Sequence, residues 1–215
     1  MSIKSDVQGF DISKNSAVIV GCGGLGTNAA VHLAGAGIGR LLLVDFDAVE
    51  VRNLNRQFFY TKGDIGKEKC GLLAERLRAY APDTEIKSRC ARFEPSFAYG
   101  YDLVVIAVDN IQTRREINAY SRKSKTPCIN GSIDGFFGTA YLYIPGKTPD
   151  LEAAGCLNET DKKMHSPSAA AGLIGALEAQ LACDYFLGKA DSAGKLYVYD
   201  NNEISALKIR SDTND

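Results

Sequence analysis

Two kinds of hydrophobic pattern alternate along the chain as far as about Ser132. Short continuous apolar runs, such as "AVIV" and "LLLV", are typical of strands buried in a parallel sheet. The longer segments between them have apolar residues at helical spacing, which is typical of helices that cover such a sheet. The pattern predicts strands at residues 17–20, 41–44, 85–89, 101–109 and 127–132, and helices at 25–36, 68–80 and 111–123. We therefore expect an α/β fold with a Rossmann-like, doubly wound and mainly parallel sheet.

The rest of the chain has a different pattern. Residues 138–146 alternate as in a half-exposed strand, and residues 195–209 read as a hairpin with its turn at Asn201 and Asn202. A helix is predicted at 167–187, with Gly188 as its C-terminal stop. Residues 147–165 show no periodicity and are interpreted as a mobile crossover loop. We expect C-terminal antiparallel strands that extend the sheet, and one domain over residues 1–215.

The composition of the chain argues against a nucleic-acid-binding protein and against a membrane protein. The chain is 45% hydrophobic and 24% charged, with a formal net charge of −1, which argues against a nucleic-acid-binding protein. No apolar run approaches the ~20 residues of a membrane span, and the polar first residues do not resemble a signal peptide. Six cysteines occur without a CxxC pair, as expected for reduced thiols. We expect a cytoplasmic protein that binds neither membrane nor nucleic acid.

A glycine fingerprint follows the first predicted strand and opens the first helix. Its pattern is Gly21-x-Gly23-x-x-Gly26, with Gly24 inside the same loop. Such glycines allow a tight turn and a close approach of the backbone to phosphate, and the helix N-terminus favours an anion. Asp45 ends the second strand, where a carboxylate can accept hydrogen bonds from ribose hydroxyls. These features predict a nucleotide site but do not distinguish a hydride carrier from a nucleotide that is consumed.

Polar residues beyond the second strand favour a triphosphate. Arginine and lysine can neutralise charge on a phosphoryl group in transfer, and a carboxylate beside phosphates is a reasonable Mg²⁺ ligand. A dehydrogenase site has little need of two cations here. Asp109 follows the next strong strand, on the sheet edge where open α/β folds bind ligands. The candidates in this region are Asp45, Asp47, Asn53, Arg56, Gln57 and Lys69 for the nucleotide, with Asp109 for magnesium.

An ordered set of motifs carries a family resemblance. The motifs are "GCGGLG", "DFD", "NLNRQ", "IGKEK" and "DNIQTR", in this order along the chain. Together they resemble the ThiF/MoeB/HesA adenylyltransferases, bacterial relatives of the adenylation domains of ubiquitin-activating enzymes. The chain is most similar to the short ThiF-like proteins, over roughly residues 16–188. The resemblance implies ATP-dependent adenylation of the C-terminal glycine of a small ubiquitin-like sulfur-carrier protein ending in Gly-Gly, with release of pyrophosphate.

The resemblance also implies roles for individual residues. The glycine loop would approach the nucleotide and Asp45 would hold the ribose. Asn53, Arg56 and Lys69 would contact phosphates, and Asp109 would coordinate Mg²⁺, so that Arg56, Lys69 and Asp109 carry catalysis. A carboxylate is ionised at neutral pH and needs no general base to attack the α-phosphorus. The protein must bring two anions together and stabilise the charge between them.

The sequence departs from the family in several places. Many members bind zinc through two CxxC pairs, whereas this chain has only Cys156 where one pair is expected, so we predict no zinc site. Cys156 is the one exposed-looking candidate nucleophile, although an incidental thiol is the favoured interpretation. Relatives donate an N-terminal arginine to ATP across a dimer interface, and residues 1–16 contain none. A homodimer is still expected, from the family and from the long apolar helical stretch Ala169–Leu187.

Three alternatives are also compatible with the sequence. Within the same chemistry, the substrate could be a molybdopterin-type carrier or a peptide rather than a ThiS-like carrier for thiamine thiazole. The glycine fingerprint and Asp45 are also compatible with an NAD-dependent oxidoreductase. The departures from the family leave room for a non-catalytic nucleotide-binding interaction module.

Overall fold

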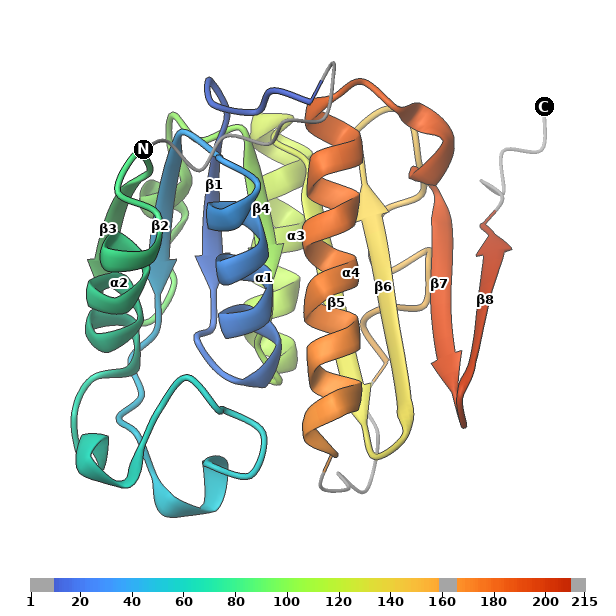
Figure 1. Cartoon of the computed structure of the whole chain (residues 1–215). Helices are drawn as coiled ribbons and strands as arrows, with labels where there is room; N and C mark the ends of the chain where they lie inside the picture. The colour runs from blue at the N-terminus through green and yellow to red at the C-terminus, as the bar shows by residue number, and fades with distance from the viewer. Residues whose placement is uncertain (1–9, 159–165, 210–215) are drawn as a thin grey trace, which may run out of the picture.

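A twisted sheet of eight strands runs through the computed structural model, which describes residues 10–158 and 166–209 (Figure 1). The strand order is β3-β2-β1-β4-β5-β6-β7-β8. Neighbours from β3 to β5 are parallel, and β6, β7 and β8 each pair antiparallel with the preceding strand. The strands are β1 Ser16–Val20, β2 Arg40–Val44, β3 Glu85–Arg89, β4 Leu103–Ile106, β5 Cys128–Asp134, β6 Phe137–Tyr143, β7 Lys195–Asp200 and β8 Glu203–Lys208.

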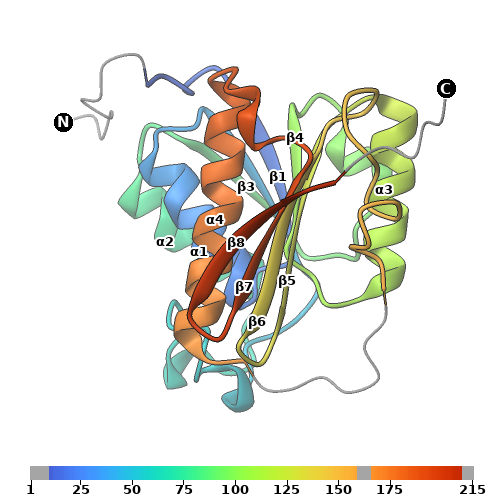
Figure 2. The ribbon, with the colours of Figure 1, turned by 90° about the vertical axis from the view of Figure 1, so that its right-hand side faces the viewer.

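Helices cover both faces of the sheet. Figure 2 shows α1, α2 and α4 on one face and α3 on the other. The predicted fold class, with a parallel core and antiparallel C-terminal strands, is confirmed. The bounds are α1 Gly24–Gly35, α2 Lys69–Tyr80, α3 Ile111–Ser124 and α4 Ser168–Phe186, with short 3₁₀ turns at Val51–Asn53, Lys62–Asp64, Pro95–Ala98 and Ala190–Ser192.

Buried strands and local turn chemistry explain why these segments fold as they do. Every residue of β1 and β4 is buried, as their continuous apolar sequences predict. The β7–β8 hairpin turns at Asn201 and Asn202, whose φ angles of 43° and 76° are left-handed, a conformation that asparagine tolerates. One strand boundary was wrong: β4 ends at Ile106, so Asp109 lies in the turn after the strand and not at its end.

Helix α4 packs closely on α1 inside the chain. A Cβ atom at Gly175 would lie 2.5 Å from the backbone oxygen of Leu25, so only glycine permits this approach. Residues such as Ala171 and Ile174 are buried at the same contact or against β6. The buried side of α4 thus belongs to the core of this chain. A role of this helix in a dimer interface stays a prediction. Among the described helices, none combines the length and hydropathy that a membrane crossing requires.

The first part of the predicted mobile loop is instead packed against the α3 side of the sheet (Figure 2). Asp150 accepts a hydrogen bond from Arg122 of α3 (3.0 Å), and the Leu151 amide donates to Asn118 Oδ1 (3.2 Å). Cys156 is buried with Leu151, and burial raises the pKa of its thiol to about 12. The expectation of an exposed Cys156 is therefore wrong, and the thiol is not poised to ionise. Residues 159–165 of the predicted loop lie outside the described residues.

One acidic residue lies in the middle of this packing. Glu178 of α4 is fully buried against β5, where a Cβ atom at Gly131 would come within 2.3 Å of its carboxyl oxygen. Neither carboxyl oxygen completes a well-formed hydrogen bond within the described part of the chain. Burial raises the pKa of Glu178 well above its ordinary value of 4.5, and the nearby guanidinium of Arg114 opposes that rise only in part. The carboxyl group is stabilised in its protonated form.

We expect the Glu178→Gln variant to be more stable than the parent protein at neutral pH. A raised native pKa means that folding gains the full benefit of the neutral group only below about pH 4.5, and loses it as pH rises. Glutamine does not ionise, so the difference in unfolding free energy should widen from near zero at acid pH to more than about 1.4 kcal/mol at neutral pH.

Denaturant unfolding at several pH values measures this difference. The matched control is Glu75→Gln, on the exposed face of α2, which should change stability little at any pH. A stability difference for Glu178→Gln that stays constant with pH would contradict a buried, neutral carboxyl group.

Candidate nucleotide-binding site

The predicted site residues lie at the carboxyl ends of β1, β2 and β4, the lower edge of the sheet in Figure 1. The strand order reverses here, because β1 lies between β2 and β4. Open α/β sheets bind ligands outside such a switch point. The glycine loop follows β1, the segment 45–68 follows β2, and the turn with Asp109 follows β4. The fold therefore brings together three parts of the chain that are distant in sequence.

The glycine loop is a tight turn that leaves a helix N-terminus without a side-chain cap. Gly21 has a φ of 97°, and a Cβ atom there would lie 2.6 Å from the backbone oxygen of Ala107. A Cβ atom at Gly26 would lie 1.8 Å from the oxygen of Gly21. The N-cap of α1 is Gly23, and among the described residues no side chain caps its first amides. Those amides and the helix dipole suit the phosphates of a nucleotide.

Asp45 fixes the glycine loop to the end of β2. The Cys22 amide donates to Asp45 Oδ2 (2.6 Å) and the Asp47 amide donates to Oδ1 (2.8 Å). Burial raises the pKa of the Asp45 carboxyl, and these two amides counteract the rise. Each carboxylate oxygen still has a lone pair for a further donor, so the arrangement is compatible with the predicted contact to ribose hydroxyls.

The segment after β2 folds back over the glycine loop. The Tyr60 hydroxyl donates to the backbone oxygen of Cys22 (2.8 Å), which joins the two segments. The Arg56 side chain runs beside the start of α1, with its Cγ 3.6 Å from a Cβ position at Gly24. Gln57 is buried next to Gly23, and its Oε1 lacks a hydrogen-bond partner within the described residues. An unpaired buried amide oxygen at this place suits a ligand donor.

The turn at Asn53 sets the position of these two side chains. The backbone oxygen of Asn53 accepts the amides of Arg56 (3.2 Å) and Gln57 (3.0 Å). Asn53 itself is buried, and Arg56 is partly buried with its Nη1 donating to Asn55 Oδ1 (3.1 Å). Arg56 has no carboxylate partner among the described ion pairs, so its charge is available to an anion.

Lys69, unlike Arg56, is paired with a carboxylate. Its side chain is only 4% exposed, and its Nζ lies 3.1 Å from Asp47 Oδ2. The Lys69 amide also donates to the Asp47 backbone oxygen (3.0 Å). Asp47 therefore orients Lys69 from both its backbone and its side chain. A contact between Lys69 and phosphate stays a prediction, and it requires the lysine to share or exchange this carboxylate.

Asp109 lies on the same edge and is exposed. Its turn contacts the glycine loop through Val108, whose Cγ1 lies 2.9 Å from a Cβ position at Gly21. The next residue, Asn110, caps α3 by accepting the Thr113 amide (3.0 Å). Asp109 belongs to no cluster of three metal-ligating side chains within the described residues. Mg²⁺ beside a nucleotide takes most of its ligands from phosphate and water, so one carboxylate is compatible with the predicted role.

Two buried side chains behind Asp109 were not singled out from the sequence. Arg114 donates from Nε to the Val108 oxygen (2.9 Å) and from Nη2 to the Gly131 oxygen (3.3 Å). It thereby clamps the turn that carries Asp109 to strand β5. Asn130 is fully buried on β5, and both atoms of its amide lack a hydrogen-bond partner within the described part. Arg114 is part of the "DNIQTR" motif, and Glu178, one of the two acidic residues in the largely apolar α4 sequence, was a second available signal.

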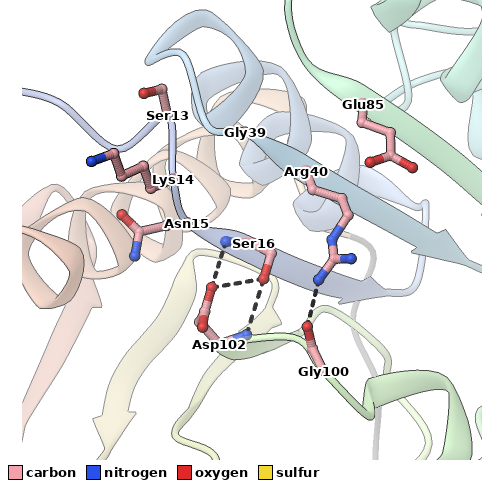
Figure 3. A pocket seen from close by; sticks show the side chains of 9 residues that line it. All are labelled: Ser13, Lys14, Asn15, Ser16, Gly39, Arg40, Glu85, Gly100 and Asp102. Atoms are coloured by element: carbon pink, nitrogen blue, oxygen red, sulfur yellow. Dashed lines mark hydrogen bonds between the residues drawn. The ribbon is translucent and has the colours of Figure 1, made fainter.

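A polar hollow at the opposite edge of the sheet is not a rival site. Figure 3 shows it at the amino ends of the parallel strands, where Ser16 and Asp102 face each other. Asp102 Oδ2 accepts the amide (2.8 Å) and hydroxyl (2.7 Å) of Ser16, and Arg40 donates to the Gly100 oxygen. These groups satisfy one another and join β1 to the segment before β4. Their role is structural.

The chain resembles known proteins in both sequence and fold. The ThiF family model matches residues 5–215. The chain is 33% identical to the sulfur carrier protein ThiS adenylyltransferase of Escherichia coli, covering 91% of this chain and 82% of that protein. It is 34% identical to the sulfur carrier protein adenylyltransferase of Thermus thermophilus, covering 92% and 79%. A crystal structure of E. coli MccB with MccA-N7isoASN superposes with a TM-score of 0.84 at 22% identity, covering 94% of this chain and 67% of that one.

The MccB structure supports the fold alone, because it is only 22% identical to this chain. The family model and the two sulfur-carrier adenylyltransferases identify the family. This protein belongs to the ThiF family, as its motifs predicted, and shares the adenylyltransferase class of these relatives.

Proposed function

We propose that this protein uses ATP to adenylate the C-terminal glycine carboxylate of a small ubiquitin-like sulfur-carrier protein, releasing pyrophosphate. The observation that carries the proposal is the meeting, at one sheet edge, of an uncapped helix N-terminus, two cations and an exposed carboxylate. The relatives named as sulfur-carrier adenylyltransferases support the substrate class. We further propose a ThiS-like carrier, and therefore a place in thiamine thiazole formation, and a cytoplasmic location.

The residues at this sheet edge have different roles in the proposed reaction. The glycine loop and the first amides of α1 would hold phosphate oxygens, and Asp45 and Gln57 would orient the nucleoside through its hydroxyls and other donors. Asn53 would hold the loop that presents Arg56. Mg²⁺, when bound at Asp109, would neutralise phosphate charge.

Catalysis then depends mainly on electrostatics and positioning. The carrier carboxylate and the α-phosphate are both anions, and Arg56 with Lys69 lowers the repulsion between them as they approach. The oxygen of the carboxylate forms a bond to the α-phosphorus, while the bond from that phosphorus to the pyrophosphate oxygen breaks. Pyrophosphate leaves with both electrons of the broken bond. Since the nucleophile is already ionised, the chain needs no residue to remove a proton from it.

The C-terminal strands offer a binding surface for the globular part of the carrier. We propose that it lies over β6–β8, with its tail extending towards the glycine loop. β8 is an edge strand that is exposed throughout, and it presents Ile204 (59% exposed) and Leu207 (53% exposed). An edge strand with exposed apolar side chains is suited to a protein partner. A homodimer, carried over from the family, remains part of the proposal.

The alternatives differ in what they leave unused. A molybdopterin-type carrier or a peptide would use the same residues, and only the partner distinguishes these substrates. An NAD-dependent oxidoreductase would use the glycine loop and Asp45. Hydride transfer would not require Arg56, Lys69 or Asp109. A non-catalytic module would bind ATP without forming pyrophosphate. Family membership favours adenylation over both of these last two.

Carrier-dependent exchange of radiolabel between pyrophosphate and ATP tests the proposed reaction and site. With Mg²⁺ and a Gly-Gly-ended carrier, we expect exchange in the parent protein and a loss of about 10²–10³-fold in Arg56→Ala and in Asp109→Ala, the range for removing a group that stabilises transition-state charge. Deletion of the carrier's last glycine should abolish exchange.

Two matched controls separate the site from nearby charge. Arg52→Ala removes a surface arginine of the same segment that pairs with Glu50, and Asp83→Ala removes an exposed carboxylate between α2 and β3. Both should leave exchange near the parent rate. Loss of exchange in the controls, or full exchange in Arg56→Ala, would contradict the assignment.

Nucleotide preference provides a second test, against the oxidoreductase alternative. A ligand at 100 times its Kd stabilises a protein by about 2.7 kcal/mol, which for a chain of this size raises the Tm by roughly 5–10 °C. We expect such a shift with Mg-ATP and none with NADH at the same concentration, measured by differential scanning fluorimetry. A larger shift with NADH than with ATP would favour a hydride carrier.

A further inference from the structure

Three side chains with metal-binding atoms meet beside the nucleotide site. The ligand atoms of Glu68, Cys70 and Cys90 all lie within 4.8 Å of one another. Glu68 is the N-cap of α2, Cys70 lies in its first turn, and Cys90 directly follows β3. Parallel pairing of β2 with β3, in the register of Val44 with Arg89, puts the end of β3 beside the end of β2. An isolated bridge between Ala48 and Glu68 then holds the start of α2 next to the segment that follows β2. The fold therefore brings Cys90 to Glu68 and Cys70, from which it is separated in the chain by α2 and β3.

The donor set is specific in its chemistry. Two thiolates and a carboxylate suit a thiophilic divalent cation, and they are poor ligands for Mg²⁺ or Ca²⁺, which prefer oxygen. Zn–S bonds of about 2.3 Å and Zn–O bonds of about 2.0–2.2 Å put tetrahedral ligand atoms roughly 3.5–3.8 Å apart. Separations of up to 4.8 Å thus require only small side-chain rotations for closure. Three protein ligands would leave a fourth position for water.

The surroundings allow a cation to enter. Glu68 and Cys90 are exposed, whereas Cys70 is buried, so the cluster opens to solvent on one side and rests on the core on the other. The remaining cysteines, Cys22, Cys128, Cys156 and Cys183, are buried and belong to no such cluster within the described residues. Cys90 is thus the single exposed thiol of the described chain, and it faces two further ligands.

We propose that Glu68, Cys70 and Cys90 form a binding site for a thiophilic divalent cation, best suited to Zn²⁺. Binding replaces the thiol protons by metal–sulfur bonds and releases these protons to solvent, so the affinity rises with pH. Our sequence-based expectation of no zinc considered only paired CxxC motifs, and this site has none. The proposal does not depend on the proposed function, because it concerns metal binding alone.

The site has a direct structural link to the nucleotide edge. Lys69 lies between two of the three ligands in the chain and is fixed to Asp47 at the nucleotide edge. An occupied site would hold the first turn of α2 rigidly and thereby fix Lys69. Metal binding would in this way stabilise the chain segment that presents one of the candidate phosphate contacts.

Cobalt(II) is the probe that reports the ligands directly. The full chain, kept reduced and freed of metal, should bind about one equivalent of Co²⁺ with a thiolate-to-cobalt charge-transfer band and the visible bands of tetrahedral coordination. Zn²⁺ should displace the Co²⁺ and abolish these bands, and a large excess of Mg²⁺ should not. A spectrum without thiolate charge transfer in the parent protein would overturn the proposal.

Variants then assign the ligands through competition with a chromogenic zinc chelator. Cys70→Ser and Cys90→Ser should each weaken Zn²⁺ binding by about 100-fold or more, and Glu68→Gln by about 10-fold or more, since loss of even an outer-shell partner costs 10–100-fold. Cys183→Ser and Glu75→Gln are the matched controls and should bind as the parent does.

Folding is checked separately by the thermal unfolding of each metal-free variant. Cys90 is exposed, so Cys90→Ser should unfold close to the parent Tm, and its loss of affinity can then only reflect a lost ligand. Parent-like Zn²⁺ affinity in a folded Cys90→Ser protein would overturn the assignment.

Discussion

The Asp45 carboxylate, with its two backbone hydrogen bonds, is the interaction on which the site depends. It accepts the amide of Cys22 in the glycine loop and the amide of Asp47 beyond β2. A buried carboxylate is costly unless such donors satisfy it, so the two segments are tied at one point. Gly21 and Gly26 make this possible, because any side chain there would collide with the neighbouring backbone. The helix N-terminus is thereby left open towards the edge where Arg56, Lys69 and Asp109 gather.

Buried side chains beneath this edge of the sheet hold its loops in place. Tyr60 joins the segment after β2 to the glycine loop, and Arg114 clamps the turn of Asp109 to β5. Beneath Arg114 lies Glu178, a buried acid stabilised in its neutral form between α4 and β5. Polar groups are thus buried under the site at a cost in stability. Such a cost is usual where a protein must hold functional groups in a fixed arrangement.

The sequence predicted most of the fold because its signals were local. Continuous apolar runs identified the buried strands, and the pair Asn201–Asn202 identified the last hairpin, since each depends on a few neighbouring residues. Asp109 was placed at a strand end because the apolar run continues past the hydrogen-bonded ladder, which ends at Ile106. Cys156 looked exposed because its loop has no periodicity, yet Leu151 and its neighbours pack on the sheet without forming a helix or strand.

The site was predictable only where a motif kept its residues together. The glycine loop and Asp45 share one βαβ unit, so their proximity follows from the sequence. The pairing of Lys69 with Asp47, the clamp at Arg114 and the cluster of Glu68, Cys70 and Cys90 depend on tertiary packing that has no local signature.

In the proposed reaction, a carrier carboxylate attacks the α-phosphorus of ATP. Isotope transfer tests it most directly: the carrier's C-terminal carboxylate is labelled with ¹⁸O, the reaction is run with ATP and Mg²⁺, and the adenylate is hydrolysed. We expect AMP that carries one ¹⁸O atom and pyrophosphate that carries none, as read by mass spectrometry. Unlabelled AMP, or formation of ADP and phosphate instead, would contradict it.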